Sequence, residues 1–166
     1  LVIELDVQRE RYAAENAAWS RVERPKLVIV ARPTNLFQVD LSYDRLRTRR
    51  NSHDLRITPG MNPTRIRRST WMRVAQAISE HEPTVLAADP QYLVSLAPFL
   101  HPHEVSNLRE IVLAQHALFS FQRVLLERHF GRPATSLYHC GESGMIGTSC
   151  RHERLHLLES YAHYDV

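Results

Sequence analysis

The sequence predicts a single α+β domain, because runs typical of strands lie toward both ends of the chain and helical patterns lie between them. This order favours an α+β domain over a doubly wound sheet. With 166 residues the chain is long enough to bury one hydrophobic core, and its 43% hydrophobic content is typical of globular proteins.

Five segments have the composition of strands. Residues 26–31 (KLVIVA) and 84–88 (TVLAA) are short apolar runs, and residues 36–43 (LFQVDLSY) alternate between apolar and polar side chains. Residues 135–140 (TSLYHC) and 150–159 (CRHERLHLLE) predict the last two strands. Between them, residues 141–149 (GESGMIGTS) hold three of the five glycines and predict a tight loop.

Three segments predict helices. Residues 4–23 contain good helix formers and neither proline nor glycine, so we expect an N-terminal helix. Residues 69–81 have helical apolar spacing, with Ser69 or Thr70 as the N-cap. The longest helix is expected over about residues 103–130, ending at Gly131. Residues 44–63 are polar and predict a long loop.

The basic residues are almost all arginines, and only Lys26 is a lysine. Eight arginines fall between Arg45 and Arg68. A solvated loop is the favoured interpretation, and a patch for a phosphate-rich ligand or nucleic acid is the alternative. The segment lacks the interleaved aromatic residues that stack on bases, which argues against nucleic acid.

Several features predict a cytoplasmic protein. No apolar run is long enough to cross a membrane, and the first residues lack the layout of a signal peptide. The two cysteines, Cys140 and Cys150, are expected to be reduced thiols.

The C-terminal part holds the pattern most suggestive of chemistry. His152, Arg154 and His156 are spaced by two, so a strand would place them on one face. The preceding glycine-rich loop could bind an anion through backbone N–H groups, aided by the hydroxyls of Thr148 and Ser149.

The segments "GTSC" and "HERLHLL" resemble the signature of the histidine-triad (HIT) superfamily of nucleotide hydrolases and transferases. In this resemblance His152 and His156 match the first and third histidines, and Gly147 and Ser149 match the loop that contacts the α-phosphate. The resemblance implies a HIT-like antiparallel sheet with one long helix and an N-terminal helical extension. It covers residues 84–158, the expected HIT-like core of a single domain over 1–166. Residues 1–70 form an atypical part with the Arg-rich loop.

Arg154 departs from the signature, because the superfamily's middle histidine is the nucleophile and a guanidinium has no lone pair to offer. We therefore expect an atypical hydrolase of phosphoesters or phosphoramidates, or a nucleotidyltransferase. His152 and His156 would act as acid and base, while Arg154, Gly147, Thr148 and Ser149 hold phosphate. The expected partner is a nucleotide or another phosphorylated small molecule, not nucleic acid or a membrane. No cofactor is expected, and family members suggest a homodimer.

Two alternatives remain open. A domain without its nucleophile could be a degenerate, non-catalytic nucleotide binder. The second alternative is a zinc or other metal site, because potential ligands gather within 18 residues: His139, Cys140, Cys150, His152 and His156. Their spacing fits no standard zinc motif. The histidines could also be ordinary hydrogen-bonded side chains on a sheet.

Overall fold

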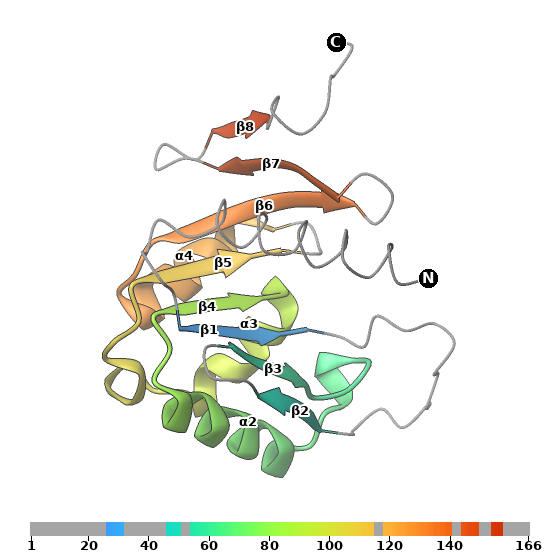
Figure 1. Cartoon of the computed structure of the whole chain (residues 1–166), viewed down its shortest axis with the longest axis vertical. Helices are drawn as coiled ribbons and strands as arrows, with labels where there is room; N and C mark the ends of the chain where they lie inside the picture. The colour runs from blue at the N-terminus through green and yellow to red at the C-terminus, as the bar shows by residue number, and fades with distance from the viewer. Residues whose placement is uncertain are drawn as a thin grey trace.

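The computed structural model describes residues 26–31, 46–50, 54–114, 118–140, 144–149 and 154–157. Within these ranges eight strands form one sheet in the order β2-β3-β1-β4-β5-β6-β7-β8 (Figure 1). Helices alternate with strands through the middle of the chain, so the prediction of a mixed α and β fold is confirmed. None of the described helices is both long and apolar enough to span a bilayer.

The centre of the sheet is parallel. β3, β1, β4, β5 and β6 pair in parallel, whereas β2, β7 and β8 pair in antiparallel fashion at the two ends. The strands are β1 (Leu27–Val30), β2 (Arg47–Arg50), β3 (Asp54–Thr58), β4 (Val85–Ala88), β5 (Glu110–Leu113), β6 (Ala134–Cys140), β7 (Gly144–Ser149) and β8 (Leu155–Leu157).

Three α-helices connect successive parallel strands. β3, β4, β5 and β6 follow one another in one direction across the sheet, and right-handed crossovers then place the connecting helices on one face. Apolar residues from all three helices accordingly belong to one buried cluster. The helices are α2 (Arg68–His81), α3 (Pro90–Leu96) and α4 (Ser120–Phe130), and the 3-10 turns are η1 (Pro63–Arg65), η2 (Ala97–Phe99) and η3 (Pro102–Val105).

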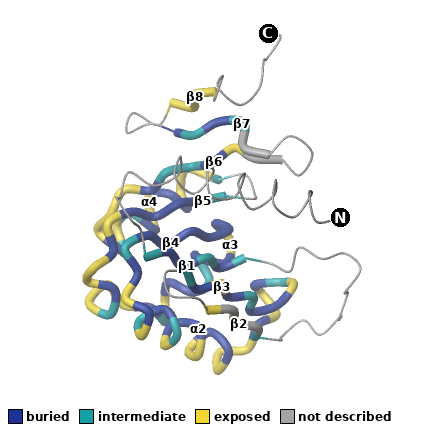
Figure 2. The backbone as a smooth tube through the Cα atoms, viewed as in Figure 1, coloured by how far each residue is buried: buried dark blue, intermediate teal, exposed yellow. Residues whose placement is uncertain are grey.

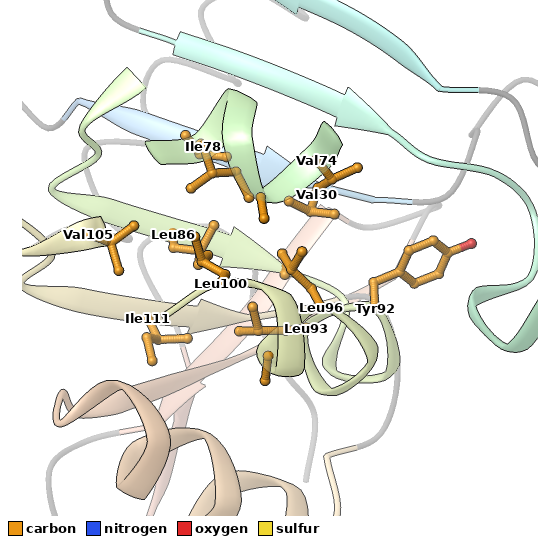
Figure 3. Close-up of a cluster of buried hydrophobic side chains, with 14 of the residues drawn as sticks. Val30, Val74, Ile78, Leu86, Tyr92, Leu93, Leu96, Leu100, Val105 and Ile111 are labelled. Atoms are coloured by element: carbon orange, nitrogen blue, oxygen red, sulfur yellow. The ribbon is translucent and has the colours of Figure 1, made fainter. Parts of the chain in front are cut away.

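The main core lies between the sheet and these helices. Val30, Leu86 and Ile111 come from neighbouring strands, and they lie beside Val74 of α2 and Leu93 of α3 (Figure 3). Alternate strand residues point to the other face, where a smaller buried cluster gathers Leu27, Val85, Ala87, Val112 and Leu137. Because both faces are buried, β4 and β5 have no exposed position (Figure 2).

The local pattern identified some elements correctly. The strands predicted at residues 26–31, 84–88 and 135–140 correspond to β1, β4 and β6, and the helix predicted at residues 69–81 corresponds to α2. Its predicted N-cap is wrong, because the cap position is Arg67, which makes no side-chain capping bond. The predicted helix at residues 4–23 and strand at residues 36–43 lie outside the described residues.

Three predicted elements are wrong. The long helix over residues 103–130 is interrupted by β5, because the β-branched Ile111 and Val112 fill a buried strand, and a short apolar run suits either element. The loop over residues 44–63 contains β2 and β3, which pair with each other. The glycine-rich loop over residues 141–149 contains β7, which pairs with β6 and β8.

The HIT-like antiparallel arrangement is also wrong for the centre of the sheet. Four of the described strand pairings are parallel, and they join β3, β1, β4, β5 and β6. A parallel pair needs a crossover connection, which α2, α3 and α4 supply here.

Candidate functional site

The carboxyl ends of β1 and β4 define the candidate site. These strands are parallel neighbours, yet the chain passes from β1 toward β3 on one side and from β4 toward β5 on the other. Connections that diverge in this way mark a switch point, and open α/β sheets bind ligands at the carboxyl ends of the strands there.

Asp89 lies at this end of the sheet, directly after β4. Its backbone N–H donates to the Val30 carbonyl at 3.3 Å, which joins the ends of the two strands. Its carboxylate is buried and accepts from the Gln91 N–H at 2.9 Å, so it caps the start of α3. The site therefore contains a fixed carboxylate beside the ends of two parallel strands.

The neighbouring strand ends are fixed by similar contacts. The Ala31 N–H donates to the Ile57 carbonyl at 3.1 Å, and the Ala114 N–H donates to the Ala88 carbonyl at 3.0 Å. These bonds extend the sheet by one residue past β1 and β5. Backbone hydrogen bonds thus join the carboxyl ends of β3, β1, β4 and β5.

Tyr92 of α3 ties the segment after β3 to the same edge. Its hydroxyl donates to the Gly60 carbonyl at 2.6 Å, and the Tyr92 side chain is buried. Trp71 of α2 packs edge-on against the Tyr92 ring, with centroids 6.2 Å apart. Both aromatic side chains therefore fix the position of the segment after β3.

Ser149, predicted to hold phosphate, takes part in a buried polar network. Its Oγ accepts from the Ser136 N–H at 2.8 Å and lies 3.5 Å from Nη2 of Arg123, which also donates to Ser136 Oγ at 2.6 Å. The network joins β6, β7 and α4 on the helical face of the sheet. This environment gives the Ser149 hydroxyl a structural role.

His156 lies on the opposite face from Ser149. β8 pairs with β7 so that His156 is opposite Thr148 and Leu155 is opposite Ser149. Opposed residues in an antiparallel pair share a face, and consecutive residues alternate. His156 and Thr148 are thus together, while the predicted grouping of His156 with Ser149 is not formed. His156 and Arg154 are both exposed.

Gly147, also predicted to hold phosphate, lies where two backbones come close. A methyl group at this position would lie 2.7 Å from the carbonyl oxygen of His156. The close pairing of β7 with β8 is thus a packing reason for this glycine.

The remaining predicted residues are only partly described. Cys150, His152 and the side chains of His139 and Cys140 lie outside the described part of the structure. Among the residues that the structure describes, no group of three or more potential ligands could hold a metal ion. The metal site and the catalytic roles of His152, Arg154 and His156 stay predictions.

No family model and no curated protein sequence matches the chain. Solved structures do match it. Apo MatB from Rhodopseudomonas palustris is 16% identical, with a TM-score of 0.53 over 84% of this chain and 26% of that one. The ATP-bound RpMatB-BxBclM chimera B3 is also 16% identical, with a TM-score of 0.54 and the same coverages.

A third structure is an open conformation of 2-hydroxyisobutyryl-CoA ligase in complex with 2-HIB-AMP and CoA. It is 14% identical, with a TM-score of 0.50 over 74% of this chain and 27% of that one. At these identities the likeness shows a shared fold. The chain spans about a quarter of the length of these structures.

The resemblance to the HIT superfamily is therefore wrong, and with it the predicted HIT-like hydrolase or transferase. The structures that share this fold include a CoA ligase, and the fold has parallel strands at its centre.

The switch point between β1 and β4 was missed in the sequence, although a signal for it exists. The runs KLVIVA, TVLAA and EIVLA are short and apolar, as buried parallel strands are, and α2 and α3 separate them. Asp89-Pro90 directly after the second run is typical of a strand end that leads into a helix.

Proposed function

We propose that the chain is a nucleotide-binding domain of an adenylate-forming acyl ligase, in which ATP and a carboxylic acid give an acyl-AMP intermediate. The observation that supports this proposal best is the shared fold, which extends over 84% of this chain in an ATP-bound chimera. The 2-hydroxyisobutyryl-CoA ligase, which has this fold, was solved in complex with an acyl-AMP, and one of its structures also contains CoA.

The switch point at the carboxyl ends of β1 and β4 is the proposed place for the nucleotide. It lies at the carboxyl edge of the parallel strands, where nucleotides bind in open α/β sheets. Asp89 and the strand ends around it are held by backbone hydrogen bonds, so the edge is formed before a ligand arrives. A preformed site loses less conformational entropy on binding.

Two expectations from the sequence, the class of ligand and the single domain, are part of this proposal. The partner remains a nucleotide or another phosphorylated small molecule, now held at the carboxyl edge of the parallel strands. We also propose that the chain is one domain, because all the strands in its described part belong to one sheet.

Isothermal titration calorimetry of the 166-residue chain with ATP tests the proposal. We expect saturable binding with a Kd below about 1 mM, equivalent to about 4 kcal/mol of binding free energy. Adenosine is the matched control, because it keeps the base and ribose and lacks the phosphates. Equal affinity for adenosine and ATP, or no binding of ATP at several millimolar, would contradict the proposal.

A further inference from the structure

A second candidate site lies at the opposite end of the parallel strands, where β4, β5 and β6 begin. A cavity of about 460 Å³ opens there, which is within the usual range for small-molecule sites. Its lining residues come from the segments that lead into these three strands: Thr84, Ser106, Asn107, Leu108, Arg109 and Arg132.

Backbone hydrogen bonds fix the floor of this cavity. The Lys26 N–H donates to Thr84 Oγ1 at 2.8 Å, and the Arg109 N–H donates to the Thr84 carbonyl at 2.8 Å. The Leu108 N–H donates to the Val105 carbonyl at 2.9 Å, which fixes the turn that carries Ser106 and Asn107. The segments that lead into β4 and β5 therefore give this side of the cavity a defined shape.

Arg132 is held in place at the rim of the cavity. Gly131 ends α4 with a φ of 63°, a left-handed conformation that favours glycine and turns the chain sharply. The Nε–H of Arg132 donates to the Leu108 carbonyl, and Nη1 donates to the Gly131 carbonyl at 3.1 Å. These bonds orient the guanidinium and use only two of its five N–H donors.

The lining of the cavity is positively charged. Arg109 and Arg132 are its two charged residues, and Ser106, Asn107 and Thr84 add neutral polar groups. The acidic neighbour in the sequence, Glu110, is not part of the lining, because its Oε1 accepts from Thr135 Oγ1 at 2.6 Å. The cavity thus offers several donors to an anion, and none of the described residues that line it carries a carboxylate.

We propose that this cavity binds a phosphorylated small molecule, with a phosphate held by Arg109 and Arg132. A guanidinium presents paired donors that fit the oxygens of a phosphate, and the hydroxyl and amide groups can satisfy the remaining oxygens. The volume exceeds that of a single phosphate ion, so a ligand with more than one phosphate, or with an attached organic group, fits better. This inference is independent of the nucleotide site, which lies at the other edge of the sheet.

Pyrophosphate titrated into the 166-residue chain at constant ionic strength tests the proposal. Arg109 is exposed, so Arg109→Ala is expected to fold normally and to weaken pyrophosphate binding by about tenfold or more, the usual effect of losing a charged hydrogen bond. Arg73→Ala is the matched control, because Arg73 is an exposed arginine on α2 and does not line the cavity. Its affinity should equal that of the wild type.

Amide chemical shifts from the same titration locate the ligand. We expect the largest changes at Ser106, Asn107 and Arg109. Changes confined to Asp89 and Ala114 would overturn the proposal while supporting the nucleotide site. Citrate supplies the same charge through carboxylates, and tighter binding of citrate than of pyrophosphate would overturn the phosphate assignment. Equal affinity in Arg109→Ala and the wild type, or no binding of pyrophosphate at 10 mM (about 100 times the Kd of a moderate site), would overturn the site itself.

Discussion

Replacing Ser149 with alanine distinguishes a structural role for this hydroxyl from the phosphate-binding role that the sequence predicted. The Ser149 Oγ accepts from the Ser136 N–H at 2.8 Å, so the substitution leaves that N–H without its acceptor. It also removes the contact at 3.5 Å with Nη2 of Arg123, whose guanidinium lies inside the network.

The size of the effect follows from the burial of these groups. A buried donor that loses its partner costs about 1–3 kcal/mol, and Ser136 is half-buried, so water can replace part of the bond. We expect Ser149→Ala to lower the free energy of unfolding by about 1–2 kcal/mol. In a chain of this length that loss corresponds to a decrease in Tm of about 2–8 °C.

Urea denaturation followed by circular dichroism measures this loss. Ser95→Ala is the matched control, because the Ser95 hydroxyl donates to the Gln91 carbonyl within α3 and its removal leaves no N–H group without an acceptor. The control should change stability by less than about 0.5 kcal/mol. If both variants unfolded at the same urea concentration, the Ser149 network would have no structural importance and this reasoning would be refuted.

Two further substitutions test the packing around the sites. Gly147→Ala places a methyl group 2.7 Å from the His156 carbonyl oxygen, so β8 should separate from β7. The amides of β8 should then exchange with solvent about tenfold faster or more in hydrogen-exchange NMR. Unchanged exchange rates of these amides would contradict the packing reason for Gly147. Tyr92→Phe leaves the buried Gly60 carbonyl without its donor and should cost about 1 kcal/mol in urea denaturation. A stability equal to that of the wild type would mean that this bond does not stabilise the segment after β3.

Local patterns were sufficient for elements whose sequence suits only one structure. β1 and β4 are short apolar runs ended by proline or polar residues, and α2 has helical apolar spacing over 14 residues. β5 was missed because the residues on either side of it also suit a helix. Its strand conformation depends on hydrogen bonds to β4 and β6, which lie far from it in the sequence.

Which of the predicted site residues lie together depends on contacts of the same kind. The spacing of Arg154 and His156 says which residues of one strand share a face, but it does not say which residues of another strand join them. That information lies in the register of β7 with β8, which puts Thr148 beside His156 and turns Ser149 to the other face. The order of strands, and with it the switch point between β1 and β4, likewise depends on contacts between residues far apart in the sequence.

We propose that the carboxyl ends of the parallel strands bind a nucleotide. The most direct test is a titration of the ¹⁵N-labelled chain with ATP, followed by amide chemical shifts at individual residues. We expect saturable changes in the amide chemical shifts of Ala31, Asp89 and Ala114, which lie just past the ends of β1, β4 and β5. Saturable changes elsewhere with none at these three amides, or no changes at several millimolar ATP, would contradict it.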